Sequence, residues 1–439
     1  MTHPGGPSRL WPDRVRARLD DVVEGGRWRA PREFDARGPV GLLDGETVVS
    51  FASNDYLGLS AHPTVIAAAG AALERWGAGT GASRLVTGSR PVHSALERAL
   101  ARWKGTDAAV CFPTGFAANL GALSVLGGPG VRVLSDELNH ASIIDGCRLS
   151  RSMASIYRHR DTAHLCAILE ADATTPTIVV TDTVFSMDGD AAPVAEIADL
   201  CRRHGALLLL DEAHAVLGPH LSPDLLTDPD LTLVRMGTLS KTLGSLGGFL
   251  AASEDVIHLM VNQARPYIFT TGLTPADTAA ALAALEVLRS PEGDALVRRL
   301  SDLVARVAPP GRDADAAGWA GVTVPASPII PVILGTEQAA LEASAALLAA
   351  GLWVPAIRPP TVPAGTSRLR VTVSAAHSDD QVALLVAALA PLRQREAGTD
   401  ANVDADAGPL RGSASDSTGG SGTAPTRVGV PDGALIRSH

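Results

Sequence analysis

The chain has 439 residues, a formal net charge of −10 and 46% hydrophobic residues, so it is long enough for two or three domains with a substantial core. No long basic run is present, which argues against nucleic acid as a partner. No uncharged apolar run reaches membrane-spanning length, and Met1 to Arg18 lacks the apolar stretch of a signal peptide. The four cysteines form no Cys-x-x-Cys pair, which argues against a disulfide framework and a zinc site. Free cysteines of this kind are typical of the reducing cytoplasm.

The predicted elements alternate along the first two thirds of the chain. Residues 8–24 carry apolar side chains at helical spacing and predict a short amphipathic helix, and Thr47–Ala52 predicts a strand. Six further apolar runs predict strands separated by helices, at Ala108–Phe112, Val131–Ser135, Thr177–Thr181, Ala206–Leu210, Leu233–Met236 and Gly248–Ala252. Continuous apolar runs of this kind predict a mostly parallel sheet covered by helices on both faces.

The pattern restarts near residue 290. Strands at Ile329–Leu334 and Arg368–Val373, with helices at Glu337–Ala350 and Ser378–Arg395, predict a smaller α/β domain. From about Glu396 the chain consists of small and polar residues without periodicity, which predicts a disordered tail. We therefore expect an N-terminal segment (1–50), a large domain (51–290), a small C-terminal α/β domain (291–395) and a tail (396–439).

Lysine is almost absent from the chain. Lys104 and Lys241 stand against 35 arginines, and Lys241 lies among small residues and glycines in the run Thr238–Gly248. A desolvated lysine can lose its proton and condense with a carbonyl, whereas an arginine stays protonated. Lys241 is therefore a candidate Schiff-base lysine, with an exposed loop lysine as the alternative.

An acidic box, Asp211-Glu212-Ala213-His214, follows the apolar strand Ala206–Leu210. The same box occurs in helicases, but that function needs a Gly-Lys-Ser/Thr phosphate loop, and neither lysine here follows a glycine. Asp211 and Lys241 each follow a strand, and ligands of open α/β sheets bind at the carboxyl ends of strands. Pyridoxal phosphate needs this pair, a lysine for its aldehyde and a carboxylate for its ring nitrogen. His214 is placed to hydrogen-bond the ring hydroxyl.

Two further segments suit the same cofactor. Thr114-Gly115-Phe116 follows a strand and opens a predicted helix, whose N-terminal amides can bind a phosphate. The alternative for this segment is an ordinary strand–helix turn. His140 follows the strand Val131–Ser135 and can stack on the pyridine ring, with a core or capping histidine as the alternative.

Seven motifs in this order resemble the α-oxoamine synthases, which are fold-type I pyridoxal phosphate enzymes. The motifs occupy residues 53–59, 79–84, 114–119, 139–142, 184–190, 211–214 and 238–241. The resemblance runs from about residue 10 to 395. It implies an α/β fold with a large domain on a mostly parallel seven-stranded sheet, a small C-terminal α/β domain, and a homodimer with shared active sites.

The run Ala356–Arg370 resembles the members of this family that act in biotin biosynthesis. Those members condense L-alanine with pimeloyl-CoA or pimeloyl-carrier protein, so this acyltransferase activity is what the resemblance implies. A sister activity on glycine and a short acyl thioester, as in glycine C-acetyltransferase, is the first alternative. A fold-type I aldolase or lyase is disfavoured by Arg358 and its run, and a non-catalytic subunit is disfavoured by Lys241.

The resemblance also implies roles for single residues around the cofactor ring. Lys241 would bind the aldehyde and remove the α-proton, Asp211 would pair with the ring nitrogen, and His214 would hydrogen-bond the ring oxygen. His140 would stack on the ring, and Ser186 would lie near the ring oxygen and the substrate. No metal is implied.

The remaining implied residues concern the phosphate and the substrate. The phosphate would be held by the amides of Gly115 and Phe116, the hydroxyl of Thr238 and, from the neighbouring subunit, Thr270 and Thr271. Arg358 would hold the amino-acid carboxylate through its bidentate fork. Asn54 and Arg29 would line the substrate entrance.

Two departures from the family pattern concern the cofactor surroundings. The segment after His214 is about two residues shorter than in relatives, so the position of His214 is the least constrained. Asp182 stands where several relatives have glutamate, and we expect the partner of that longer carboxylate to be out of its reach.

Overall fold

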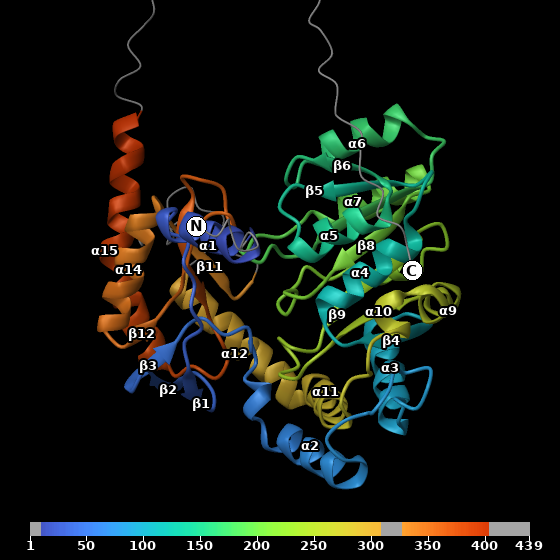
Figure 1. Ribbon diagram of the computed structural model, residues 1–439, viewed down its shortest axis with the longest axis horizontal. Helices are drawn as coiled ribbons and strands as arrows, with labels where there is room; N and C mark the ends of the chain where they lie inside the picture. Colours follow the sequence, from blue (N-terminus) through green and yellow to red (C-terminus); the bar gives the residue numbers. More distant parts are fainter. Residues whose placement is uncertain (1–9, 309–326, 404–439) are drawn as a thin grey trace, which may run out of the picture. The chain divides into compact units, whose positions relative to one another are not determined.

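The computed structural model describes residues 10–308 and 327–403, with the backbone alone from 393 to 403 (Figure 1). The chain divides into a unit from Met1 to Ala397 and a unit from Gly398 to His439. The fold and the site below belong to the first unit. The expected disordered tail lies outside the described residues from 404 onward.

The largest sheet of the first unit has seven strands in the order β4-β10-β9-β8-β7-β5-β6 (Figure 1). Its strands are β4 (Ala108–Phe112), β5 (Arg132–Asp136), β6 (Met153–Tyr157), β7 (Thr177–Asp182), β8 (Leu207–Asp211), β9 (Leu233–Thr238) and β10 (Gly248–Ala252). The pairs among β5 to β9 are parallel, and β10 is antiparallel to both of its neighbours. The predicted mostly parallel sheet is therefore confirmed.

Helices cover both faces of this sheet because alternate strand residues point to opposite sides. On one face Val180 and Leu209 pack with helices α4, α5 and α9. On the other face Val179 and Leu208 pack with α6 and α7. The helices of this part are α2 (Pro63–Trp76), α3 (Pro91–Lys104), α4 (Gly115–Leu126), α5 (Ala141–Ser150), α6 (Thr162–Ala171), α7 (Val194–His204), α8 (Pro223–Leu226), α9 (Glu254–Gln263), α10 (Arg265–Ile268), α11 (Pro275–Leu288) and α12 (Pro291–Val307).

Two smaller sheets complete the fold. One has the order β1-β2-β3-β12 and the other the order β11-β14-β13. Their strands are β1 (Phe34–Ala36), β2 (Val40–Leu43), β3 (Glu46–Ser50), β11 (Ile329–Gly335), β12 (Leu352–Trp353), β13 (Ala356–Ile357) and β14 (Ser367–Thr372). The strands β3 and β12 pair in parallel, so the N-terminal strands share a sheet with the C-terminal region. The division at residues 50 and 290 stays a prediction.

The remaining helices lie at the N-terminal end of the described chain and in its C-terminal region. The predicted N-terminal helix is α1 (Leu10–Glu24), and it buries none of its residues, since Leu10, Trp11 and Val15 are all exposed. The predicted C-terminal helices are α14 (Glu337–Ala349) and α15 (Asp379–Val403), and α15 runs past Arg395, where the predicted helix ends. No helix in the described ranges is long and apolar enough to cross a membrane.

Candidate active site

A cavity of about 210 Å³ lies at the carboxyl ends of β7, β8 and β9, beside the N-terminus of α4. Its lining residues are Thr114, Gly115, Phe116, His140, Ser142, Asp182, Asp211, Ala213, His214, Met236, Thr238, Ser240 and Lys241. The structure therefore brings together seven of the residues expected to contact the cofactor, from four separate motifs. Parallel strands produce this convergence because their carboxyl ends meet at one edge of the sheet.

A chain of hydrogen bonds begins at the amine of Lys241. Nζ lies 2.7 Å from Nε2 of His214, and Nδ1 of His214 lies 2.5 Å from the hydroxyl of Tyr56. Tyr56 donates its one hydrogen to Oδ1 of Asn54 at 3.2 Å. Nδ1 of His214 must therefore carry the ring proton, and Nε2 accepts from Lys241.

Burial sets the protonation states of this chain. Burial lowers the pKa of Lys241 to about 8, and nearby Asp211 and Asp182 only partly oppose that shift. Burial also lowers the pKa of His214 well below its usual range, and the positive charge of Lys241 adds to the effect. His214 is thus neutral at pH 7, and a substantial fraction of Lys241 is a neutral amine just above it.

Asp211 ends β8 with its carboxylate held by two donors. Nδ2 of Asn119 donates to Oδ2 at 2.8 Å, and the backbone amide of Ala213 donates to Oδ1 at 3.0 Å. Asp211 is almost fully buried, and its register partner on β7 is Asp182, which lines the same cavity. The Asp211 carboxylate is therefore fixed in position inside the cavity.

Asp182 accepts a hydrogen bond at Oδ2 from the backbone amide of His140 at 2.7 Å. The shorter side chain thus reaches a partner at the start of α5. Burial raises the pKa of Asp182 well above its usual range, and the neighbouring Asp211 carboxylate raises it further. Loss of water around a buried carboxyl and the negative charge of Asp211 both disfavour the ionised form of Asp182.

The N-terminus of α4 offers backbone amides to the cavity. Thr114 caps the helix by accepting from the amide of Ala117 at 3.0 Å, whereas the amides of Gly115 and Phe116 have no acceptor within the part of the chain that the structure describes. Thr238 lies beside Gly115, since a side chain on Gly115 would meet its Oγ1 at 3.6 Å. Free amides and a hydroxyl at a helix N-terminus suit an anion such as phosphate.

His140 caps α5 and exposes its ring to the cavity. Its Nδ1 accepts from the hydroxyl of Ser142 at 2.7 Å, so its Nε2 carries the proton. Burial lowers the pKa of His140, with Asp211 opposing and Lys241 adding to the shift. The ring meets Phe116 edge-on, with 6.3 Å between the two ring centroids.

Six other predicted site residues do not line this cavity. Ser186 presents its backbone carbonyl to Arg370, and Asn54 is bonded to Tyr56 and Arg370. Arg358 donates to the carbonyl of Gly26 at 2.8 Å, so it holds the segment after α1. The other three are exposed and do not meet the cavity in this single chain: Arg29, Thr270 and Thr271.

Arg370 is a residue that sequence reasoning missed. It lies on β14 and is buried, with Nε donating to Ser186 at 2.6 Å, Nη1 to Thr372 at 3.0 Å and Nη2 to Asn54 at 3.1 Å. Its positive charge helps to lower the pKa of Lys241. The signal was present, because arginine at two alternate positions of an apolar strand indicates buried charges on one face.

Comparison with known proteins identifies the family. The aminotransferase class I and II family matches residues 46–389. The 8-amino-7-oxononanoate synthase of Anaeromyxobacter sp. (strain K) is 50% identical over 379 residues, which cover 83% of this chain and 92% of that protein. The enzyme of the same name from Burkholderia lata is 45% identical over 88% of this chain and 98% of its own length. The chain belongs to the 8-amino-7-oxononanoate synthase family.

A solved structure shares the fold of this 8-amino-7-oxononanoate synthase family member. The high-resolution structure of SPT with PLP, a serine palmitoyltransferase, is 30% identical, and the match covers 90% of this chain and all of that one with a TM-score of 0.79. Both comparisons agree with the fold-type I architecture predicted from the motifs. His214 is held at both ring nitrogens, by the hydroxyl of Tyr56 and the amine of Lys241, and the shorter segment after it stays a prediction.

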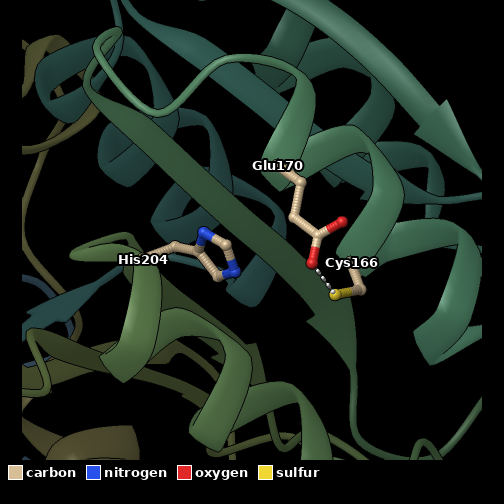
Figure 2. A group of neighbouring side chains, drawn as sticks. All are labelled: Cys166, Glu170 and His204. Carbon is tan, nitrogen blue, oxygen red and sulfur yellow. Dashed lines mark hydrogen bonds between the residues drawn. The ribbon is translucent and has the colours of Figure 1, made fainter.

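One group of possible metal ligands lies outside the cavity of this 8-amino-7-oxononanoate synthase family member. In the described residues Cys166, Glu170 and His204 bring their ligand atoms within 4.8 Å of one another (Figure 2). The thiol of Cys166 donates to Oε1 of Glu170 at 3.3 Å, and this bond raises the pKa of the thiol. Because the thiol keeps its proton and Glu170 is exposed, we assign no metal to this group.

Proposed function

We propose that the protein uses pyridoxal phosphate to condense L-alanine with pimeloyl-CoA or pimeloyl-carrier protein. The products are 8-amino-7-oxononanoate, carbon dioxide and the free thiol. The observation that carries the proposal is the cavity that joins the Lys241 amine, the fixed Asp211 carboxylate and the free amides of α4. The names of the relatives at 45–50% identity support the choice of substrates.

The lining residues fit this cofactor. Gly115, Phe116 and Thr238 would bind its phosphate, Asp211 its ring nitrogen, and Lys241 its aldehyde carbon. His140 would lie against the ring, with His214 and Ser186 toward the ring oxygen. When bound, the cofactor supplies an electron sink for the carbanion formed at the α-carbon of an amino acid.

The chain's own groups then move and hold protons. The neutral amine of Lys241 accepts the α-proton of the amino acid, since its lowered pKa leaves much of it unprotonated near pH 8. His214 accepts a hydrogen bond from that amine and so directs it within the cavity. Asp211 keeps a proton on the ring nitrogen, because its two donors hold the carboxylate in place.

Two arginines are proposed for the amino-acid carboxylate. The family resemblance implies Arg358, whose guanidinium is already bonded to Gly26. Arg370 has N–H donors left after its three bonds and acts electrostatically on Lys241. Asn54, which is bonded to Arg370, and Arg29 would line the entrance.

We also propose a homodimer with shared active sites, in the cytoplasm. An exposed apolar group, Leu85, Val86 and Phe269, lies along the chain on either side of the bridge between Ser83 and Thr271. Burying this group against a second copy would take the exposed Thr270 and Thr271 toward the neighbour's phosphate. The four free cysteines are in keeping with the cytoplasm.

The test is a product analysis of the cofactor-loaded protein. L-Alanine and glycine are each combined with acetyl-, pimeloyl- and longer acyl thioesters, on coenzyme A and on a carrier protein, and the products are identified by mass spectrometry. Formation of 8-amino-7-oxononanoate from L-alanine and a pimeloyl thioester alone is the expected result. A product from glycine and acetyl-CoA would instead make the protein a glycine C-acetyltransferase.

A further inference from the structure

His159 lies outside the cavity and joins two carboxylates. Its Nδ1 lies 2.9 Å from Oδ1 of Asp136, at the end of β5, and its Nε2 lies 3.0 Å from Oδ2 of Asp190. Both ring nitrogens can face carboxylate acceptors only when both carry hydrogen, so this geometry requires the imidazolium form. The edge of the ring rests on Phe185, with 4.3 Å between the ring centroids.

Asp190 belongs to the active-site loop, which we define as residues Val184–Ala191. The loop closes on itself through the bridge between Val184 and Ala191. The carbonyl of Gly189 accepts from the hydroxyl of Ser327 at 3.0 Å, and Asp188 pairs with Arg368 of β14. The active-site loop therefore connects the large sheet to β14.

The same loop holds Arg370. The carbonyl of Ser186 accepts from Nε of Arg370 at 2.6 Å, and Nη2 of Arg370 reaches Asn54. Asn54 accepts in turn from Tyr56, which bonds His214 beside Lys241. A shift of the active-site loop would therefore reach the reacting amine through an unbroken series of hydrogen bonds.

We propose that His159 is a positioning residue, which fixes the active-site loop to the end of β5 and thereby holds Arg370 for the amino acid. This inference rests on the proposed function and goes beyond it, since none of the resemblances assigns His159 a role. The side chain of His159 contacts Asp136, Asp190 and Phe185, so it acts on substrate only through the loop.

The charges around His159 explain why it stays protonated. Burial alone would lower the pKa of His159, but the bonds to Asp136 and Asp190 outweigh burial and raise it to about 9. Glu137 faces its backbone amide at 3.5 Å, and Arg160 shares Asp190 at 2.9 Å. The link is therefore complete at neutral pH and weakens as the pH rises through about 9.

The first experiment measures amino-acid kinetics in the holoenzyme. We expect H159Q to raise the KM for L-alanine about tenfold and to leave cofactor affinity within about twofold, because a small displacement of a positioned group costs binding of the substrate it holds. H258Q is the matched control. His258 is exposed, and its Nε2 lies 3.8 Å from the exposed carboxylate of Glu254, which is too far for a hydrogen bond. An unchanged KM in H159Q would overturn the proposal.

The second experiment uses pH to separate positioning from general damage. The ratio of kcat/KM between wild type and H159Q cancels the ionisations that both proteins share. We expect a ratio of about ten at pH 7 that falls toward one above pH 9, because wild-type His159 then loses a bond to one carboxylate. A ratio that stays constant across this range would mean a merely structural role.

A third measurement does not depend on which substrate is correct. Hydrogen exchange in the active-site loop of the cofactor-loaded protein should be faster in H159Q and D190N than in wild type, and unchanged in H258Q. If the loop exchanges faster but no product forms from L-alanine, the proposed function has failed and the positioning role stands. Unchanged exchange in the loop would overturn the positioning role whatever the substrate.

Discussion

Asn119 holds Asp211 in place, with its Nδ2 donating to Oδ2 of the aspartate at 2.8 Å. Asn119 is fully buried in α4, the helix whose first amides face the cavity. One helix thus presents the anion site at its N-terminus and orients the carboxylate proposed for the ring nitrogen from its second turn. Both ends of the cofactor would then be set by a single rigid element.

Replacing Asn119 should test this arrangement. In N119A the buried Asp211 loses one of its two donors, so we expect the free energy of unfolding to fall by about 1–3 kcal/mol and cofactor affinity to fall as well. Urea unfolding and cofactor titration measure the two effects. N262A is the control, since Asn262 is exposed and bonds only its own helix. Unchanged cofactor affinity in N119A would show that Asp211 does not need this donor.

The reactivity of Lys241 should depend on pH with a midpoint near 8. The neutral amine attacks an aldehyde, so the rate at which cofactor-free protein binds pyridoxal phosphate covalently should rise about tenfold per pH unit below the pKa and level off above it. D211N should lower the midpoint, because the Asp211 carboxylate raises the pKa of Lys241. Absorbance of the bound cofactor follows the reaction. K241A should bind none covalently and lose turnover at least about a hundredfold.

The same pKa has a consequence for stability with a defined sign. Lys241 titrates near 8 in the folded protein and near its ordinary value of 10.5 when unfolded, so between these values the unfolded chain binds more protons. The Lys241 contribution to the free energy of unfolding of cofactor-free protein should therefore grow with pH in this window. Urea unfolding of wild type and K241M at pH 7.5 and 9.5 isolates it. A difference that stays constant with pH would contradict the lowered pKa.

Gly248 should not tolerate a side chain. A Cβ at this position would lie 2.5 Å from both N and Cα of Gly115, at the start of α4. We expect G248A to displace the helix N-terminus and weaken cofactor binding about tenfold or more, as read by titration. Gly70 in α2 has open space around it, so G70A should instead stabilise the protein by about 0.5–1 kcal/mol. Wild-type cofactor affinity in G248A would show that the clash is relieved elsewhere.

Lys104 belongs to a buried cluster of charges next to Asp211. Its Nζ lies 2.7 Å from Oε2 of Glu212, whose other oxygen accepts from Arg235 at 2.6 Å. K104M should cost roughly 1–3 kcal/mol of unfolding free energy, because one Glu212 oxygen would be buried without its cation. K104R should also destabilise, because a larger head group must fit the same space. Chemical denaturation measures both effects. An unchanged free energy of unfolding in K104R would show that the site accommodates the larger guanidinium group.

The sequence predicted the large sheet because its strands are buried runs, such as Ala108–Phe112 and Gly248–Ala252, that the structure reproduces at the same bounds. It missed β6, since Met153 to Ile156 are exposed and make no apolar run. It also missed the two-residue strands β12 and β13, which form only because partners distant in sequence lie beside them.

The residues of the candidate site also fall into those that the sequence predicts and those that it does not. Lys241, Asp211, His214 and His140 could be predicted because each lies at or after the carboxyl end of a strand, at the edge of the sheet where ligands bind. The contacts of Asn119 and Arg370 with the site could not, because these residues reach it from a helix interior and from another sheet, and their partners are more than 90 residues away in the chain. Such contacts depend on the packing of whole elements.

The two lysines have a practical consequence for chemical labelling. Lys104 is buried and forms an ion pair with Glu212, whereas the amine of Lys241 faces the cavity. All other lysine or arginine positions in the sequence are arginines, which ordinary amine-reactive reagents leave untouched. Of the lysine amines, such a reagent should therefore find Lys241 first, and cofactor should protect it. The extent of Lys241 labelling should therefore report the fraction of protein whose cavity holds cofactor.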